Sequence, residues 1–161
     1  MKTKAILVVL LVSNLFIFAQ NKQTSPITVS DIEKVFGAGF TAEAPSKIGD
    51  IESYRFKNKD YTIQIQLSPS YGMKSIAEYR KGGSPKTVTW KAIPNDPDGA
   101  MIEQREDGKD DLAPTPAVEY IRNNKHVRLQ ILGNYYNYDN AKMPAKCEEM
   151  RNKLSKLKRI P

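Results

Sequence analysis

The chain contains few residues of the types that carry catalysis. Among its 161 residues there is one histidine, His126, and one cysteine, Cys147. A histidine can act as a general base, and a cysteine can act as a nucleophile. His126, however, stands beside a turn at the start of an expected strand, and the chain has no G-x-S-x-G motif. We therefore expect His126 to be an exposed turn residue, and we favour a binding protein over an enzyme.

The sequence also offers no convincing metal or cofactor site. One histidine and one cysteine are too few for zinc, and Cys147 fits better as a small buried apolar residue. The acidic stretches "NDPDG" and "EDGKDD" suggest calcium, but aligning Gly99 with position 6 of an EF-hand loop puts Pro94 at position 1 and Arg105 at position 12. No glycine-rich phosphate loop follows a strand. We expect no metal and no cofactor.

Two stretches could instead serve in binding. In "GNYYNYDN" the tyrosines Tyr135, Tyr136 and Tyr138 alternate with amides, a mixture that suits sugar or protein surfaces. A connector whose rings cover the edge of the core is the interpretation we favour for this stretch. The C-terminal helix is basic and includes Lys153 and Lys156, so it could contact an anionic membrane or an acidic partner. A solvated helix face is the favoured alternative, because cations near a helix C-terminus are stabilised by the helix dipole.

The N-terminal segment has the layout of a secretory signal peptide. Lys2 and Lys4 precede the apolar run "AILVVLLVSNLFIFA", which ends at the small residue Ala19. The run is short for a membrane anchor, which is the alternative interpretation, and no cysteine follows it for lipid attachment. We expect cleavage near Ala19 and a periplasmic or secreted product with a formal charge of +5 instead of +7. Export makes a nucleic-acid partner improbable.

The mature chain is expected to form a flexible leader, residues 20–27, and one α+β domain, residues 28–161. Three helices are expected, in "VSDIEKVFGAGF" with Ser30 or Asp31 as its cap, in "SPSYGMKSIAEYRKGG" and in "YDNAKMPAKCEEMRNKLSKLKRI". Their apolar faces are expected to contain Ile32, Val35 and Phe36 in the first helix, Met73, Ile76, Ala77 and Tyr79 in the second, and Met143, Cys147, Met150, Leu154 and Leu157 in the third.

Alternating apolar and polar residues predict the strands. The pairs are "ESYRF" with "YTIQIQL", "KTVTWKAI" with "AMIEQRE", and "AVEYI" with "HVRLQIL". The first and third pairs are similar at an offset of 66 residues, and we favour chance convergence over duplication. The order α-ββ-α-ββ-ββ-α predicts an antiparallel sheet of about six strands with helices mainly on one face. The opposite face is expected to expose Thr62, Gln64, Gln66, Arg128 and Gln130.

These observations favour an exported, non-catalytic domain that binds a protein partner of the cell envelope, as an inhibitor or immunity-like factor does. The candidate binding residues are Gln64, Gln66, Arg128, Gln130, Tyr135, Tyr136, Tyr138, Lys153 and Lys156. Two alternatives stay open at this point. One is a binder of small ligands or glycans that uses the tyrosine-rich connector, and the other is a small hydrolase without a readable motif.

Overall fold

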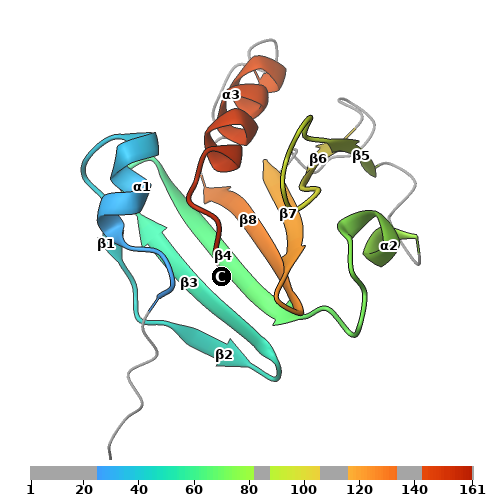
Figure 1. Ribbon diagram of the computed structural model, residues 1–161. Helices are drawn as coiled ribbons and strands as arrows, with labels where there is room; N and C mark the ends of the chain where they lie inside the picture. Colours follow the sequence, from blue (N-terminus) through green and yellow to red (C-terminus); the bar gives the residue numbers. More distant parts are fainter. Residues whose placement is uncertain (1–24, 82–87, 106–115, 134–142, 161) are drawn as a thin grey trace, which may run out of the picture.

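A computed structural model describes residues 25–81, 88–105, 116–133 and 143–160. The described residues form a mixed structure of three helices and an antiparallel sheet, which confirms the predicted α+β class (Figure 1). The helices are α1 (Val29–Phe36), α2 (Ile76–Arg80) and α3 (Met143–Ser155). The strands are β1 (Thr41–Ala42), β2 (Ser46–Ile48), β3 (Ile51–Lys57), β4 (Tyr61–Pro69), β5 (Val88–Ala92), β6 (Met101–Arg105), β7 (Ala117–Arg122) and β8 (Lys125–Gly133).

The predicted number and order of strands are wrong. The described residues form eight strands in the order β1-β3-β4-β8-β7-β6-β5, and β2 also pairs with β3. The two additional strands, β1 and β2, come from "TAEAPSKIGD", which the sequence indicated as a connector. They are two and three residues long and fully exposed, so they lack the apolar alternation by which strands are recognised.

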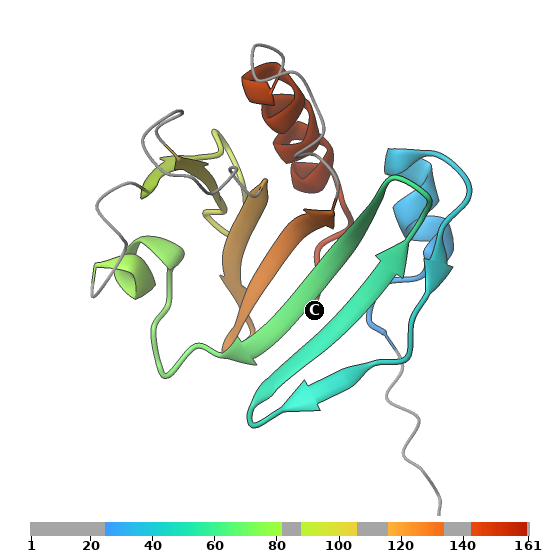
Figure 2. The same ribbon diagram turned by 180° about the vertical axis from the view of Figure 1, so that it is seen from behind.

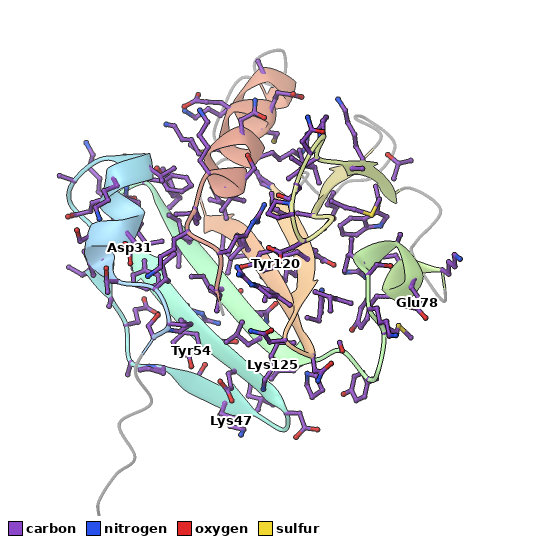
Figure 3. All side chains as sticks on the ribbon, viewed as in Figure 1. Asp31, Lys47, Tyr54, Glu78, Tyr120 and Lys125 are labelled. Carbon is purple, nitrogen blue, oxygen red and sulfur yellow. The ribbon has the colours of Figure 1, made fainter. Side chains whose placement is uncertain are left out.

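One face of the sheet carries the apolar core. Ile63 and Ile65 of β4 stand opposite Ile131 and Leu129 of β8, and all four side chains are buried. Helices α1 and α3 cover this face (Figure 1). The predicted stripe of α3 is confirmed where its side chains are described, because Cys147, Met150, Leu154 and Leu157 are all buried. Tyr120, also buried on this face, accepts a hydrogen bond from the backbone N–H of Ile160 at 2.9 Å (Figure 3).

The first two helices differ in detail from the prediction. Helix α1 is capped by Thr28, whose Oγ1 accepts from the N–H of Asp31 at 3.2 Å while the Asp31 carboxylate accepts from the N–H of Thr28 at 3.1 Å. The cap is therefore neither Ser30 nor Asp31. Ile27, which was placed in the flexible leader, is buried in the core.

Helix α2 is only five residues long, and it contacts the face of the sheet opposite the core. Ile76 is buried and Tyr79 stacks on His126, as expected, but Ala77 is exposed and Met73 precedes the helix, so only half of the predicted apolar stripe is confirmed. The placement of helices mainly on one face therefore holds for α1 and α3 and not for α2. Seen from behind, no described helix lies over β3 and β4 (Figure 2).

The two similar hairpins, β3–β4 and β7–β8, lie side by side because β4 pairs with β8. In this pairing Gln64 stands opposite Gln130, the residue that corresponds to it at the offset of 66. Their internal registers differ. Tyr54 pairs with Ile65, whereas Tyr120 pairs with Val127 and not with Ile131. The β7–β8 turn is the two-residue Asn123–Asn124, with φ of 49° and 60°, as tight hairpins require. The hairpins therefore do not match residue for residue, which favours convergence over duplication.

Candidate functional site

The face of the sheet opposite the core holds a network of buried charges. Its centre is Glu119 of β7, whose side chain is 0% exposed. Arg80 at the end of α2 donates to Glu119 from Nε at 3.0 Å and from Nη2 at 2.5 Å. Arg128 on the adjacent strand β8 donates to the same carboxylate from Nη1. We call Glu119, Arg80, Arg128, Glu103, Gln130, Gln64 and His126 together the charge network.

The charge network continues across four strands. Arg128 donates from Nη2 to Glu103 of β6 at 2.7 Å and from Nε to the amide oxygen of Gln130 at 2.8 Å. Gln130 in turn donates from Nε2 to Gln64 of β4 at 2.6 Å. Two carboxylates therefore meet two guanidiniums, with Gln130 and Gln64 extending the hydrogen bonds. This balance lets charged groups lie in the middle of a sheet, where an unpaired charge would be strongly unfavourable.

His126 also belongs to the charge network and is not the exposed turn residue expected from the sequence. It is 7% exposed, and Tyr79 of α2 stacks on its ring at a centroid distance of 4.4 Å. Its Nε2 lies 2.9 Å from Glu119, and its Nδ1 lies 3.2 Å from the hydroxyl of Ser68. An ionised carboxylate only accepts hydrogen bonds, so Nε2 carries a proton, and Nδ1 shares a hydrogen bond with the hydroxyl of Ser68.

The electrostatics keep the centre of the network ionised. Burial raises the pKa of Glu119, but hydrogen bonds from His126 and Arg80 and the charge of Arg128 outweigh it and lower this pKa to about 2. Burial lowers the pKa of Arg128, and the nearby carboxylates of Glu103 and Glu119 raise it above its usual value. Each ion thus stabilises the charged form of the other.

The charge network joins segments that are far apart in the sequence. Arg80 ties α2 to β7, and its guanidinium also lies over the ring of Trp90 of β5 at 4.5 Å from the centroid. The residues involved are separated by up to 66 positions in the sequence. Ser68, His126 and Glu119 are also connected in the order nucleophile, base and acid that acyl-transfer enzymes use. Because Glu119 is shared with two arginines, we interpret the network first as a structural element.

The predicted binding residues fall into three groups. Gln64, Gln66, Arg128 and Gln130 share one face as expected, but Gln64 is only 5% exposed, and all except Gln66 have hydrogen-bond partners. Tyr135, Tyr136 and Tyr138 lie outside the described residues. Lys153 is on α3 and Lys156 comes directly after that helix, both away from the network, and Lys153 pairs with Glu149 at 2.9 Å.

Other residues of the basic C-terminal segment have structural roles. Arg159 pairs with Asp96 and lies over the ring of Tyr120 at 4.6 Å, and Arg151 is buried. Lys146 pairs with Glu149 at 3.0 Å. The freely exposed positive surface of this segment is therefore smaller than the sequence indicated.

The sequence interpretation missed one feature, the exposed apolar side chains Ile48, Ile51 and Tyr71, which we call the apolar tip. The large apolar side chains with the greatest exposure among the described residues are Ile48 at 80%, Tyr71 at 71% and Ile51 at 43%. Ile48 pairs with Ile51 across the β2–β3 turn, and the end of β4, two residues before Tyr71 in the chain, lies at the same end of the sheet (Figures 1 and 2). Lys47 and Lys125 also lie at this lower end (Figure 3). The signal was present in "KIGDI", where two isoleucines flank a Gly-Asp turn.

The part of the chain that the structure describes contains no group of three or more His, Cys, Asp and Glu side chains placed to hold a metal ion. None of its helices has both the length and the apolar character needed to cross a bilayer.

The fold and the site together define an α+β domain with a buried charge network on one sheet face and an apolar tip at one end of the sheet. No protein-family model matches the chain, and no significant match exists among curated proteins or solved structures.

Proposed function

We propose that the protein is an exported, non-catalytic binding domain that contacts a protein partner of the cell envelope through the apolar tip, defined by Ile48, Ile51 and Tyr71. The supporting observation is the exposure of these three side chains at one end of the sheet. Exposed apolar side chains that gather in one place on a soluble domain are typical of interaction sites. The expected signal peptide places the domain in the periplasm or outside the cell.

The geometry of the tip supports a protein partner. Ile48 and Ile51 are cross-strand partners in an exposed edge hairpin, and Tyr71 offers a large ring that loses little conformational entropy when it is buried. Tyr71 also holds a positive φ of 52°, an uncommon conformation for a residue with a side chain. Backbone strain of this kind is frequent at functional sites.

Site-specific photo-crosslinking in the cells that produce the protein tests this proposal. A photoreactive amino acid at position 71 should give an adduct of one defined mass, and the same group at Lys91, an exposed residue of β5, should not. The double variant Ile48→Ser/Ile51→Ser should remove the adduct without lowering the melting temperature. Equal adducts from both positions, or an adduct that survives the double variant, would contradict the proposal.

A small hydrolase is the second candidate, and the contact between Ser68 and His126 is the observation that favours it. In this reaction Ser68 would attack an acyl group while His126 accepts the serine proton at Nδ1 and passes it to the leaving group as the acyl bond breaks, and water would then hydrolyse the acyl-Ser68 ester. A fluorophosphonate probe should then label Ser68 in the wild-type protein. Labelling should disappear in Ser68→Ala and persist in Ser53→Ala, where a serine of β3 is changed instead. Under the binding proposal the wild-type protein stays unlabelled.

A further inference from the structure

A shallow hollow of about 200 Å³ lies at the end of the sheet opposite the apolar tip. It is lined by Glu43, Arg55, Lys57, Thr62, Leu132 and Gly133. The strand register explains its form. Lys57, Thr62 and Leu132 stand in one row across β3, β4 and β8, and the backbone of Glu43 extends the sheet by donating to the carbonyl of Arg55 at 2.9 Å.

The two cations of the hollow differ from four other cations of the described chain. Arg80, Arg122, Arg128 and Arg159 each pair with a carboxylate. Arg55 and Lys57 are exposed and form no ion pair with any described residue, although Glu43 lines the same hollow. A guanidinium and an ammonium side by side on adjacent positions of one face are suited to hold an anion.

The side chains that line the hollow limit which class of anion can bind in it. The planar fork of Arg55 matches a carboxylate, and the Thr62 hydroxyl can donate or accept a further hydrogen bond. Glu43 repels a second negative charge, but it can accept a hydrogen bond from a hydroxyl group. Leu132 supplies an apolar wall. The volume is below the roughly 300–1,000 Å³ of sites for drug-sized ligands, so it suits a single small ring.

We propose that this hollow binds a small hydroxylated monocarboxylate of the sugar-acid type, with Arg55 and Lys57 on the carboxylate and Glu43 on a hydroxyl. The site is independent of the protein partner proposed above, since it lies at the other end of β3. It gives the domain a second, small-molecule ligand.

Titration of the ¹⁵N-labelled full-length mature protein with glucuronate, followed by NMR at low ionic strength, tests the proposal. Saturable shifts should occur at the amides of Arg55, Thr62 and Gly133. Glucose lacks the carboxylate and should give no saturable shift, and succinate, which carries two carboxylates, should bind more weakly than glucuronate. An amino acid also carries a carboxylate beside a hydrogen-bond donor. Alanine tests this class of ligand, because its ammonium group would take the place of the sugar hydroxyl.

Variants make the result specific. Arg55→Gln and Lys57→Gln should each raise the glucuronate dissociation constant by about 10-fold or more, as the loss of a charge-assisted hydrogen bond does. Arg122→Gln removes one positive charge elsewhere on the surface and should leave the constant within about twofold. The melting temperature of each variant should match that of the wild type, because Arg55 and Lys57 are exposed. Binding of glucose as tight as that of glucuronate, tighter binding of alanine, or an equal effect of all three variants would overturn the proposal.

Discussion

The two faces of β8 offer the clearest comparison in this molecule. On one face, Val127, Leu129 and Ile131 are buried in the apolar core. On the other, His126, Arg128 and Gln130 are held by hydrogen bonds and ion pairs to neighbouring strands. The apolar face tolerates small changes of shape because its attraction has no direction. The charged face depends on each partner, because an ion that loses its partner stays buried and unpaired.

The largest effect is expected at the centre of the charge network. Glu119→Gln leaves Arg80 without its carboxylate partner and Arg128 with Glu103 alone, around a fully buried position, so it should lower the free energy of unfolding by about 3–5 kcal/mol. Glu148→Gln changes an exposed glutamate of α3 and should cost under about 0.5 kcal/mol. Urea denaturation of both variants measures the difference. Equal stability of the two would show that the network is replaceable.

The apolar face should respond nearly as strongly. Leu129→Ala removes a fully buried side chain and should cost about 3 kcal/mol, through lost burial and the cavity left behind. Leu132→Ala changes a half-buried leucine of the same strand on the opposite face and should cost about 1 kcal/mol. If denaturant melts showed a larger loss of stability in Leu132→Ala than in Leu129→Ala, the apolar and polar faces of β8 would be assigned the wrong way round.

Low pH should reduce the stability that comes from the charged face of β8, and not the stability that comes from its apolar face. The pKa of Glu119 is about 2 in the folded protein against 4.5 for the ordinary side chain, so its stabilising contribution is complete above about pH 5 and is lost as the pH falls towards 2. By pH 3 the loss should reach about 2 kcal/mol. In Glu119→Gln this part of the acid dependence should be absent. A wild-type stability that stays constant between pH 6 and 3 would contradict the assignment.

The smallest effect concerns the edge of the network. Gln64→Ala removes the acceptor of the Gln130 amide and should cost about 1 kcal/mol, because Gln130 then keeps a partly buried donor without a partner. Gln66→Ala, on the same face of β4, should cost under about 0.5 kcal/mol. If the melting temperature fell further in Gln66→Ala than in Gln64→Ala, the boundary of the charge network would lie one residue pair away from its assigned position.

The sequence by itself determined the parts that depend on local periodicity. Alternation in "YTIQIQL" and "HVRLQIL" was sufficient to assign Ile63, Ile65 and Leu129 to one face, because successive side chains of a strand point to opposite sides. The spacing of Cys147, Met150 and Leu154 likewise identified the buried side of α3. Hairpin turns rich in asparagine were also recognisable, since that residue adopts the left-handed conformation more easily than most.

Only the tertiary structure decided what the polar face does. A glutamate inside "AVEYI" looks like a solvated residue until the pairing of β7 with β8 brings Arg128 to it and α2 brings Arg80 from 39 positions away. His126 is buried for the same reason, because β4 supplies Ser68 and α2 supplies Tyr79. The periodicity of one strand reports which residues share a face. Whether that face meets water, an ion or another segment depends on contacts between distant parts of the chain, which local sequence does not encode.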